Sequence, residues 1–218
     1  MSSRGSRPLL IFPCNGNGLE ALDCLGVDWH CVGFVDDTQQ KQDCGAFGYP
    51  VFARSVLSGM PDAQVLAVPG GPTSYRSRSQ LIAGLDIAPE RFARVIHPAA
   101  NISSRAKLGH NLLVMAGVVI TSNAVIGSHV CLLPNTVVHH DCVIGDFSLL
   151  GSNVTIAGGV TVGSNCYVAT GSSIMHGISI GAGALVGIGS NVIRDVAADT
   201  RVAGNPAKPL PQFKHSQR

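Results

Sequence analysis

Aliphatic residues recur at every sixth position along the second half of the chain. The series runs through sixteen consecutive hexads, from Ile102 to Val192, without a slip of phase. Four positions after each of them stands a small, thiol-bearing or aliphatic residue, as at Ala124, Cys142 and Val160. A period of six fits neither an α-helix nor a plain strand, but it is typical of short strands joined by corners. Both sets of residues are therefore expected to face inward.

Glycines mark the corners between these strands, where the chain must turn, as at Gly109, Gly127, Gly145 and Gly163. Three sides make one coil of a triangular prism, and stacked coils pair their backbones in parallel about 4.8 Å apart. The sixteen hexads thus predict a little over five coils of a parallel β-helix over residues 99–218, ending in a C-terminal tail. A β-sandwich or a parallel α/β sheet is the alternative, and the unbroken period disfavours it.

The first half of the chain has the pattern of an α/β domain. Strand, turn, helix and strand are expected in that order over residues 9–12, 15–18, 19–25 and 31–35. A further strand over residues 64–68 and a helix over 73–84 follow. This βαβ pattern predicts a Rossmann-like domain over residues 1–98. Its glycine turn could cradle a phosphate, and acidic residues after the second strand could hold a sugar hydroxyl. Because the G-x-G-x-x-G pattern is incomplete, a purely structural turn stays open.

Composition narrows the functional classes. The chain is 45% hydrophobic but only 5% aromatic, so its core must be filled by aliphatic side chains. The net charge of +2 comes from scattered basic residues, which disfavours nucleic acid as a partner. Since no apolar run reaches the roughly 20 residues of a membrane span, no membrane insertion is expected and the location should be cytoplasmic. The seven cysteines form no C-x-x-C pair, so reduced thiols and no bound metal are expected.

One short stretch offers candidate chemistry. His139 and His140 are followed by Asp141, which places a base beside a carboxylate that could raise its basicity. Within their hexad these residues fall outside the inward set, so they are expected on the surface of the prism. Acyl transfer from a thioester to an amine needs such a base. Ordinary surface histidines near a corner are the alternative reading.

The stretch from Val138 to Ser148 resembles bacterial nucleotide-aminosugar N-acetyltransferases and relatives linked to sialic-acid O-acetylation. The resemblance extends to the glycine turn, Asp36-Asp37, His97-Pro98 and the closing Gly204 to Lys208, which is nearly the whole chain. It implies a left-handed β-helix, a homotrimer with active sites between prisms, and acetyl-CoA as cosubstrate without a metal. It further implies acetylation of a nucleotide-linked amino sugar, a 4-amino-4,6-dideoxy sugar, in surface-glycan synthesis by direct attack.

The same resemblance assigns roles to individual residues. His140 matches the general base, and Asp141 matches the acidic residue that raises its basicity. The acetyl-CoA contacts of the family match Gly158, Thr170 and Ile188. Its sugar-nucleotide contacts match Asn15, Gly16, Asn17, Asp36 and Asp37. The chain departs from the family at Asn17 and Leu149, where relatives carry histidines.

Several functions remain open at this stage. Amine and hydroxyl acetylation need the same base, so a sugar O-acetyltransferase is an alternative, and UDP, GDP and dTDP are all possible nucleotides. A non-catalytic trimer that only binds a sugar nucleotide is another. A γ-class carbonic anhydrase would need three histidines; His140 and His176 are 36 positions apart, but the third ligand would fall at Gly181. That spacing disfavours zinc.

Overall fold

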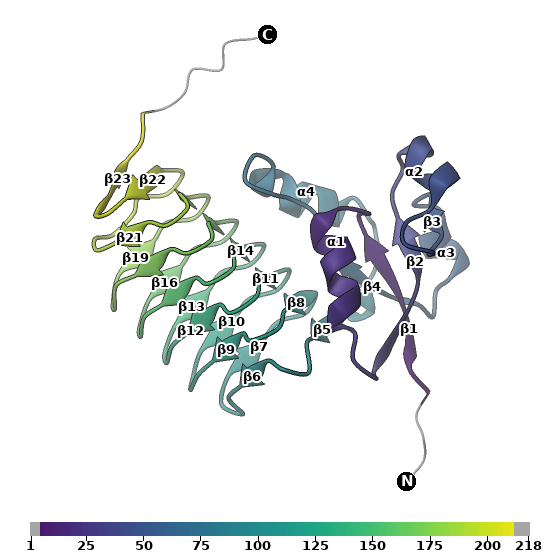
Figure 1. Cartoon of the computed structure of the whole chain (residues 1–218), viewed down its shortest axis with the longest axis horizontal. Coiled ribbons are helices and arrows are strands. Elements are labelled where there is room, and N and C mark those ends of the chain that lie inside the picture. The colour runs from purple at the N-terminus through teal and green to yellow at the C-terminus, as the bar shows by residue number, and fades with distance from the viewer. Residues whose placement is uncertain (1–4, 212–218) are drawn as a thin grey trace.

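The computed structural model describes residues 5–211, so residues 1–4 and the last part of the expected tail, residues 212–218, lie outside the described residues. The chain has an N-terminal α/β part that packs beside a long prism (Figure 1). A parallel four-stranded sheet of order β3-β2-β1-β4 forms the α/β part. Its strands are β1 (Arg7–Phe12), β2 (Trp29–Val35), β3 (Val51–Phe52) and β4 (Gln64–Ala67). The predicted α/β class is confirmed, and β3 is an additional strand.

Short helices connect these strands. They are α1 (Gly16–Glu20), η1 (Ala21–Cys24), α2 (Gln39–Cys44), α3 (Val56–Gly59), η2 (Tyr75–Ser77), α4 (Arg78–Ala83) and η3 (Pro89–Arg91). The expectation of a turn over residues 15–18 was wrong in part, because the first helix already begins at Gly16. The Asn15 side chain caps it by accepting the N–H of Gly18 at 2.8 Å, which satisfies a donor that a helix start leaves free. Within residues 5–211, no helix is long and apolar enough to cross a membrane.

Three parallel sheets form the sides of the prism. We call the side that faces the α/β part the docked sheet; it contains β5 (Arg94–Ile96), β8 (Leu112–Val114), β11 (Cys131–Leu132), β14 (Leu149–Leu150), β17 (Tyr167–Val168), β20 (Leu185–Val186), β22 (Arg201–Gly204) and the antiparallel β23 (Ala207–Pro209). The first outer sheet contains β6 (Asn101–Ile102), β9 (Val119–Ile120), β12 (Val137–Val138), β15 (Thr155–Ile156), β18 (Ser173–Ile174) and β21 (Asn191–Val192). The second outer sheet contains β7 (Lys107–Leu108), β10 (Val125–Ile126), β13 (Val143–Ile144), β16 (Thr161–Val162) and β19 (Ser179–Ile180).

The inward positions are those that the hexad pattern predicts. Ile120, Ile126 and Leu132 are buried in one continuous aliphatic core with their counterparts in the other coils. Polar residues at inward corners donate to carbonyls fifteen residues later, as the Thr136 hydroxyl does to Gly151 at 2.8 Å and the Cys142 thiol to Ala157 at 3.0 Å. The core is therefore apolar along its strands, and its buried corner groups are hydrogen-bonded.

The corner glycines act differently from the expectation. Gly145 does not adopt a left-handed conformation; instead, a Cβ there would lie 2.5 Å from the backbone nitrogen of Ser164 in the next coil. The left-handed turn is made by other residues, often asparagine, such as Asn135 and Asn153 with φ of 61° and 55°. Asparagine tolerates this conformation better than most residues, so the turn itself does not require glycine. The corner glycine is required instead by the close spacing of neighbouring coils.

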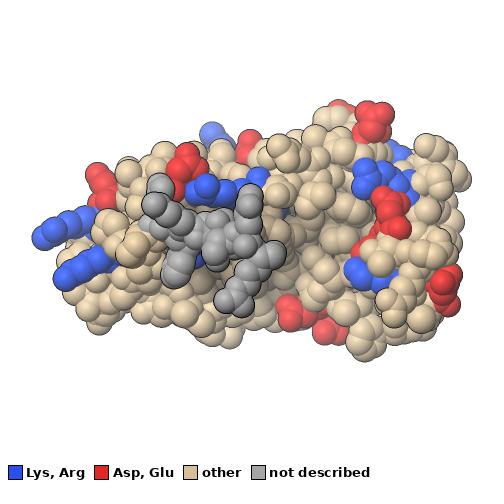
Figure 2. Space-filling model, turned by 90° about the horizontal axis from the view of Figure 1, so that it is seen from above, with Lys and Arg blue, Asp and Glu red and all other residues tan. Residues whose placement is uncertain are grey.

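The α/β part and the docked sheet share one core. Leu113, Cys131 and Leu149 project outward from the docked sheet and are buried against Leu9 and Leu66. The docked sheet already begins at β5, ahead of the division expected after residue 98. That boundary stays a prediction, since a common core joins the two parts. On the face shown in Figure 2, Lys and Arg lie in separate small groups, several of them beside Asp or Glu.

Two polar side chains fix the α/β part to the prism. Asn111 is buried and exchanges both hydrogen bonds with the backbone of Ala67, each at 2.8 Å. Arg78 is fully buried and donates to the carbonyl groups of Pro69, His129 and Phe147. No carboxylate pairs with Arg78 in the described part of the chain. Its guanidinium is thus stabilised by carbonyl dipoles on both sides of the joint.

The Asn111 amide also determines the protonation of His129. Because its oxygen accepts the N–H of Ala67, its nitrogen must donate to Nδ1 of His129 at 2.9 Å. Burial, the nearby His110 and Arg78 lower the pKa of His129 to about 4, although Asp146 acts in the other direction. His129 is therefore neutral at pH 7, stacked on Phe147 with ring centroids 4.6 Å apart.

Replacing Arg78 by alanine should lower the free energy of unfolding by at least about 2 kcal/mol, because several buried carbonyl groups lose their donor. Urea unfolding of the full chain measures this change. Arg105 is exposed, so Arg105→Ala serves as the matched control and should change stability by less than about 0.5 kcal/mol. Equal stability of the two variants would show that Arg78 does not hold the joint.

Candidate active site

His140 and Asp141 lie on the corner between the two outer sheets, which we call the outer corner. The chain passes this corner in residues 139–142, between β12 and β13. Asp141 occupies its left-handed position, with φ of 59°. Its Oδ2 lies 2.7 Å from Nδ1 of His140, and its Oδ1 accepts from the Asn123 amide at 3.0 Å. The structure therefore brings the two predicted catalytic residues together.

The carboxylate orients one of the two histidines. The hydrogen bond from His140 and then that from Asn123 hold the pKa of Asp141 below its usual value, so it is ionised at neutral pH. An ionised carboxylate only accepts, which places the His140 proton on Nδ1 and leaves Nε2 with a lone pair. The side chain of His139 makes no hydrogen bond to the described residues. The contact with Asp141 thus favours His140 over His139 as the candidate base, and the His140 side chain is 63% exposed.

Gly158 lies beside this imidazole in the next coil. A Cβ at Gly158 would lie 2.5 Å from Nε2 and 2.6 Å from Cε1 of His140. Any larger residue would therefore displace the ring. The N–H of Gly158 has no hydrogen-bond acceptor within residues 5–211, so it is free to donate to a ligand next to Nε2.

The other two expected cofactor residues lie elsewhere. Thr170 and Ile188 are stacked one coil apart on the corner between the docked sheet and the first outer sheet. Ile188 is 76% exposed. The width of the first outer sheet therefore separates them from His140 and Gly158 within one chain. Leu149, which replaces a family histidine, is 2% exposed on β14 beneath the α/β part.

The asparagines of the N-terminal turn have structural partners. The amide of Asn15 donates to Val68 and that of Asn17 to Gly70, both at 3.4 Å. A Cβ at Gly18 would lie 2.5 Å from the carbonyl oxygen of Pro13, whereas nothing lies within 4 Å of one at Gly16. The turn is therefore held tightly against the end of β4, and Gly16 is its open position.

A hollow of about 380 Å³ lies at the carboxyl ends of the strands. It is lined by Phe12, Pro13, Asp36, Asp37, Thr38, Arg54, Pro69 and Leu81. In open parallel sheets, ligands bind at this edge. They bind between two neighbouring strands whose connections run to opposite sides of the sheet. The sheet order places that point between β1 and β4. The hollow is therefore the candidate nucleotide site.

The two aspartates contribute to this hollow unequally. Asp36 is buried and paired with Lys41 at 2.6 Å. Burial acts to raise its pKa, but the hydrogen bonds from Lys41 and Thr38 outweigh it, so the pKa is below its usual value. Asp37 is half-exposed and paired with Arg54 at 3.0 Å. Sequence analysis did not identify Lys41 and Arg54 as site residues. Recognition of the short strand β3, which precedes Arg54, could have revealed Arg54.

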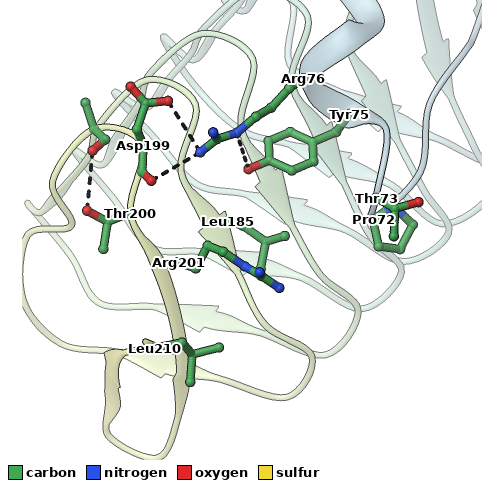
Figure 3. A pocket seen from close by; sticks show the side chains of 10 residues that line it. Pro72, Thr73, Tyr75, Arg76, Leu185, Asp199, Thr200, Arg201 and Leu210 are labelled. Carbon is green, nitrogen blue, oxygen red and sulfur yellow. Dashed lines mark hydrogen bonds and ion pairs between the residues drawn. The ribbon is translucent and has the colours of Figure 1, made fainter. Parts of the chain in front are cut away.

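A larger hollow, of about 680 Å³, lies between the loop before α4 and the last coils (Figure 3). Here the Tyr75 hydroxyl donates to the carbonyl of Gly183 at 2.9 Å, and Arg76 pairs with Asp199 at 3.4 Å. None of the expected site residues lines this hollow. Its contacts fix the loop to the prism.

Among the described residues, no group of three metal-ligating side chains is close enough to hold a metal ion.

The repeats match the family described as Bacterial transferase hexapeptide (six repeats), over residues 123–158 and 141–176. The matched residues lie within the β-helix, which therefore contains the repeats that this family model describes. No curated protein sequence matches the chain significantly. The fold of an α/β part followed by a left-handed β-helix is confirmed by solved structures that match over nearly the whole length.

PerB from Caulobacter crescentus, solved with CoA and GDP-perosamine, is 28% identical over 96% of this chain and 99% of its own, with a TM-score of 0.80. The acetyltransferase domain of PglB from Neisseria gonorrhoeae, solved with acetyl coenzyme A, is 26% identical over 94% of this chain and 100% of its own, with a TM-score of 0.82. WeeI from Acinetobacter baumannii, at 24% identity, 94% and 100% coverage and a TM-score of 0.81, shares the fold. The resemblance to sugar N-acetyltransferases is thereby confirmed.

A Gly158→Ala substitution should displace the His140 ring, because the new methyl carbon would lie only 2.5 Å from Nε2. The His140 imidazole resonances should shift and lose their sensitivity to Asp141→Asn. Gly71→Ala, where a Cβ meets nothing within 4 Å, is the control and should leave them unchanged. Unshifted His140 resonances in Gly158→Ala would mean that the ring does not rest on Gly158.

Proposed function

We propose that the chain is an acetyl-CoA-dependent N-acetyltransferase for the amino group of a nucleotide-linked amino sugar. The observation that carries this proposal is the hydrogen bond of His140 to Asp141, beside the free N–H of Gly158. The acceptor is a 4-amino-4,6-dideoxy sugar used in bacterial surface-glycan synthesis. Relatives solved with CoA and GDP-perosamine, or with acetyl coenzyme A, support both substrate classes.

His140 acts as general base in a direct transfer. The amine nitrogen attacks the thioester carbonyl carbon while Nε2 of His140 takes the amine proton. The oxygen of the tetrahedral intermediate then carries the negative charge and accepts the Gly158 N–H. When the C–S bond breaks, CoA leaves as a thiolate and takes the proton from His140, which restores the base. Asp141 stabilises the imidazolium in between through the 2.7 Å contact.

The structure supports a direct transfer through the state of Cys142. This thiol lies inside the prism and donates to the carbonyl of Ala157. Burial raises its pKa, so it is neither exposed nor a thiolate, and a nucleophile needs both properties. An acyl-enzyme on the nearest cysteine is therefore disfavoured.

The positions of the two sites support a homotrimer. In a triangular prism, the outer corner with His140 is opposite the docked sheet, against which the same chain packs its own α/β part. The prism thus separates His140 from the hollow that contains Asp37. A neighbouring subunit related by cyclic symmetry can bring its hollow to this corner. Thr170 and Ile188 are placed in the acetyl-CoA site by the same proposal, on the facing corner of a neighbouring prism.

Two alternatives differ in chemistry. A sugar O-acetyltransferase would use the same base, and only the acceptor distinguishes it. A non-catalytic sugar-nucleotide-binding trimer would not need the contact between His140 and Asp141, which therefore favours catalysis. The cytoplasmic location stays a prediction.

His140→Ala should lower kcat by roughly 10²–10⁴-fold, which is the usual contribution of a general base. Release of free CoA thiol from acetyl-CoA in the presence of an amino-sugar nucleotide measures the rate. His139→Ala and Cys142→Ser are matched controls that should keep most of the activity. If His140→Ala were as active as His139→Ala, the proposed mechanism would fail.

Co-expression of His140→Ala with Asp37→Arg should restore activity that neither variant has alone. If subunits assort at random and each site joins a hollow and a His140 from neighbouring subunits, about a quarter of the sites in the whole population of trimers are intact. Light scattering establishes the trimer, and thiol release measures the recovered rate. A trimer without recovery would place both residues of each site in one subunit.

A further inference from the structure

The hollow at the carboxyl edge of the sheet contains an acceptor and a donor fixed side by side. Asp37 Oδ1 accepts the backbone N–H of Arg54 at 2.8 Å, and Oδ2 lies 3.0 Å from Nη2 of Arg54. A third contact, from Nη1 to the carbonyl of Gly84 at 2.8 Å, holds the other end of the guanidinium. Both groups therefore have a set orientation at the rim of the hollow.

Both groups have hydrogen-bonding capacity left. An ionised carboxylate has about four lone-pair sites and a guanidinium has five N–H donors, and the contacts above use only part of each. Asp36, the other acid of the hollow, is occupied by Lys41. The groups that remain for a ligand are therefore the Arg54 guanidinium as donor and, next to it, the two carboxylate oxygens of Asp37 as acceptors.

The remaining walls suit a flat ring. Phe12, Pro13, Pro69 and Leu81 are the apolar residues of the lining. The Arg54 guanidinium carbon lies 6.0 Å from the centre of the Phe12 ring. A hollow of about 380 Å³ falls within the range of small-ligand sites. A nucleotide base can therefore enter with its polar edge toward Asp37 and Arg54.

The order of donor and acceptor discriminates among bases. Guanine presents O6, N1–H and the N2 amino group along one edge, which is an acceptor followed by two donors. This sequence matches a guanidinium followed by two carboxylate oxygens. Uracil and thymine present acceptor, donor and acceptor, so their second carbonyl oxygen would face a carboxylate oxygen with no proton between them. Adenine and cytosine present an amino donor where the guanidinium also donates.

We propose that Asp37 and Arg54 select a guanine nucleotide, so that the acceptor of the transferase is a GDP-linked amino sugar. This inference rests on the proposed function for the sugar and the acetyl transfer, but the base preference stands on the hollow alone. A matched bidentate contact in a base-reading site corresponds to roughly 5- to 150-fold in affinity. GDP should therefore bind about 10- to 100-fold more tightly than UDP or dTDP.

Titration calorimetry of the full chain with GDP, UDP, dTDP and ADP tests the preference without any acetyl transfer. Asp37→Asn replaces one carboxylate oxygen by an amide donor of the same shape, so the ratio of GDP to UDP affinity should fall to within about threefold of one. Asp62 is exposed and outside the lining, so Asp62→Asn is the control and should keep the wild-type ratio.

Binding of UDP or dTDP as tightly as GDP, an unchanged ratio in Asp37→Asn, or no binding of any nucleotide would overturn the inference. The outcomes separate it from the proposed function. Thiol release with a UDP- or dTDP-linked amino sugar but not a GDP-linked one would keep the acetyltransferase and remove the guanine preference. Selective GDP binding without acetyl transfer to any amino sugar would do the reverse.

Discussion

The repeating coil of eighteen residues is the constraint on which the candidate active site depends. From β5 to β18, each strand of the prism pairs in parallel with the strand eighteen positions later, as Val137 does with Thr155. The neighbours of a corner residue in these coils are therefore fixed by counting. Asn123 therefore lies one coil before Asp141 and donates to it, and Gly158 lies one coil after His140 and leaves room for its ring. The same register that closes the apolar core brings together the proposed base, its carboxylate and the free N–H.

At the outer corner, one position serves both the turn of the chain and the proposed chemistry. The neighbouring coils turn there through a left-handed residue, Asn123 in one and Gly159 in the other. Aspartate is among the few other residues that tolerate this conformation. In the coil of His140 the position is Asp141, so the turn itself aims a carboxylate at Nδ1. No additional helix or strand is needed to orient Asp141 toward His140.

The joint between the two parts determines where the second site can be. The docked sheet presents apolar residues outward, and the buried Arg78 and Asn111 link it to the α/β part. This rigid contact explains why a leucine suits position 149, which is buried in the joint. It also holds the nucleotide hollow away from the outer corner, which is why one chain supplies the two halves of the site to different neighbours in the proposed trimer.

The sequence by itself determined the coils, the inward positions and the exposed pair of His140 and Asp141, because each follows from a burial pattern repeated every few residues. It also indicated the α/β class and the acids after the second strand. Only the tertiary structure decided that Asp36 is occupied by Lys41 while Asp37 faces the hollow with Arg54, and that Arg78 is buried without a carboxylate. These contacts join segments far apart in the chain, such as Asn111 and Ala67, or follow a two-residue strand such as β3. No local periodicity encodes them, because the partners meet only when the sheet packs on the prism.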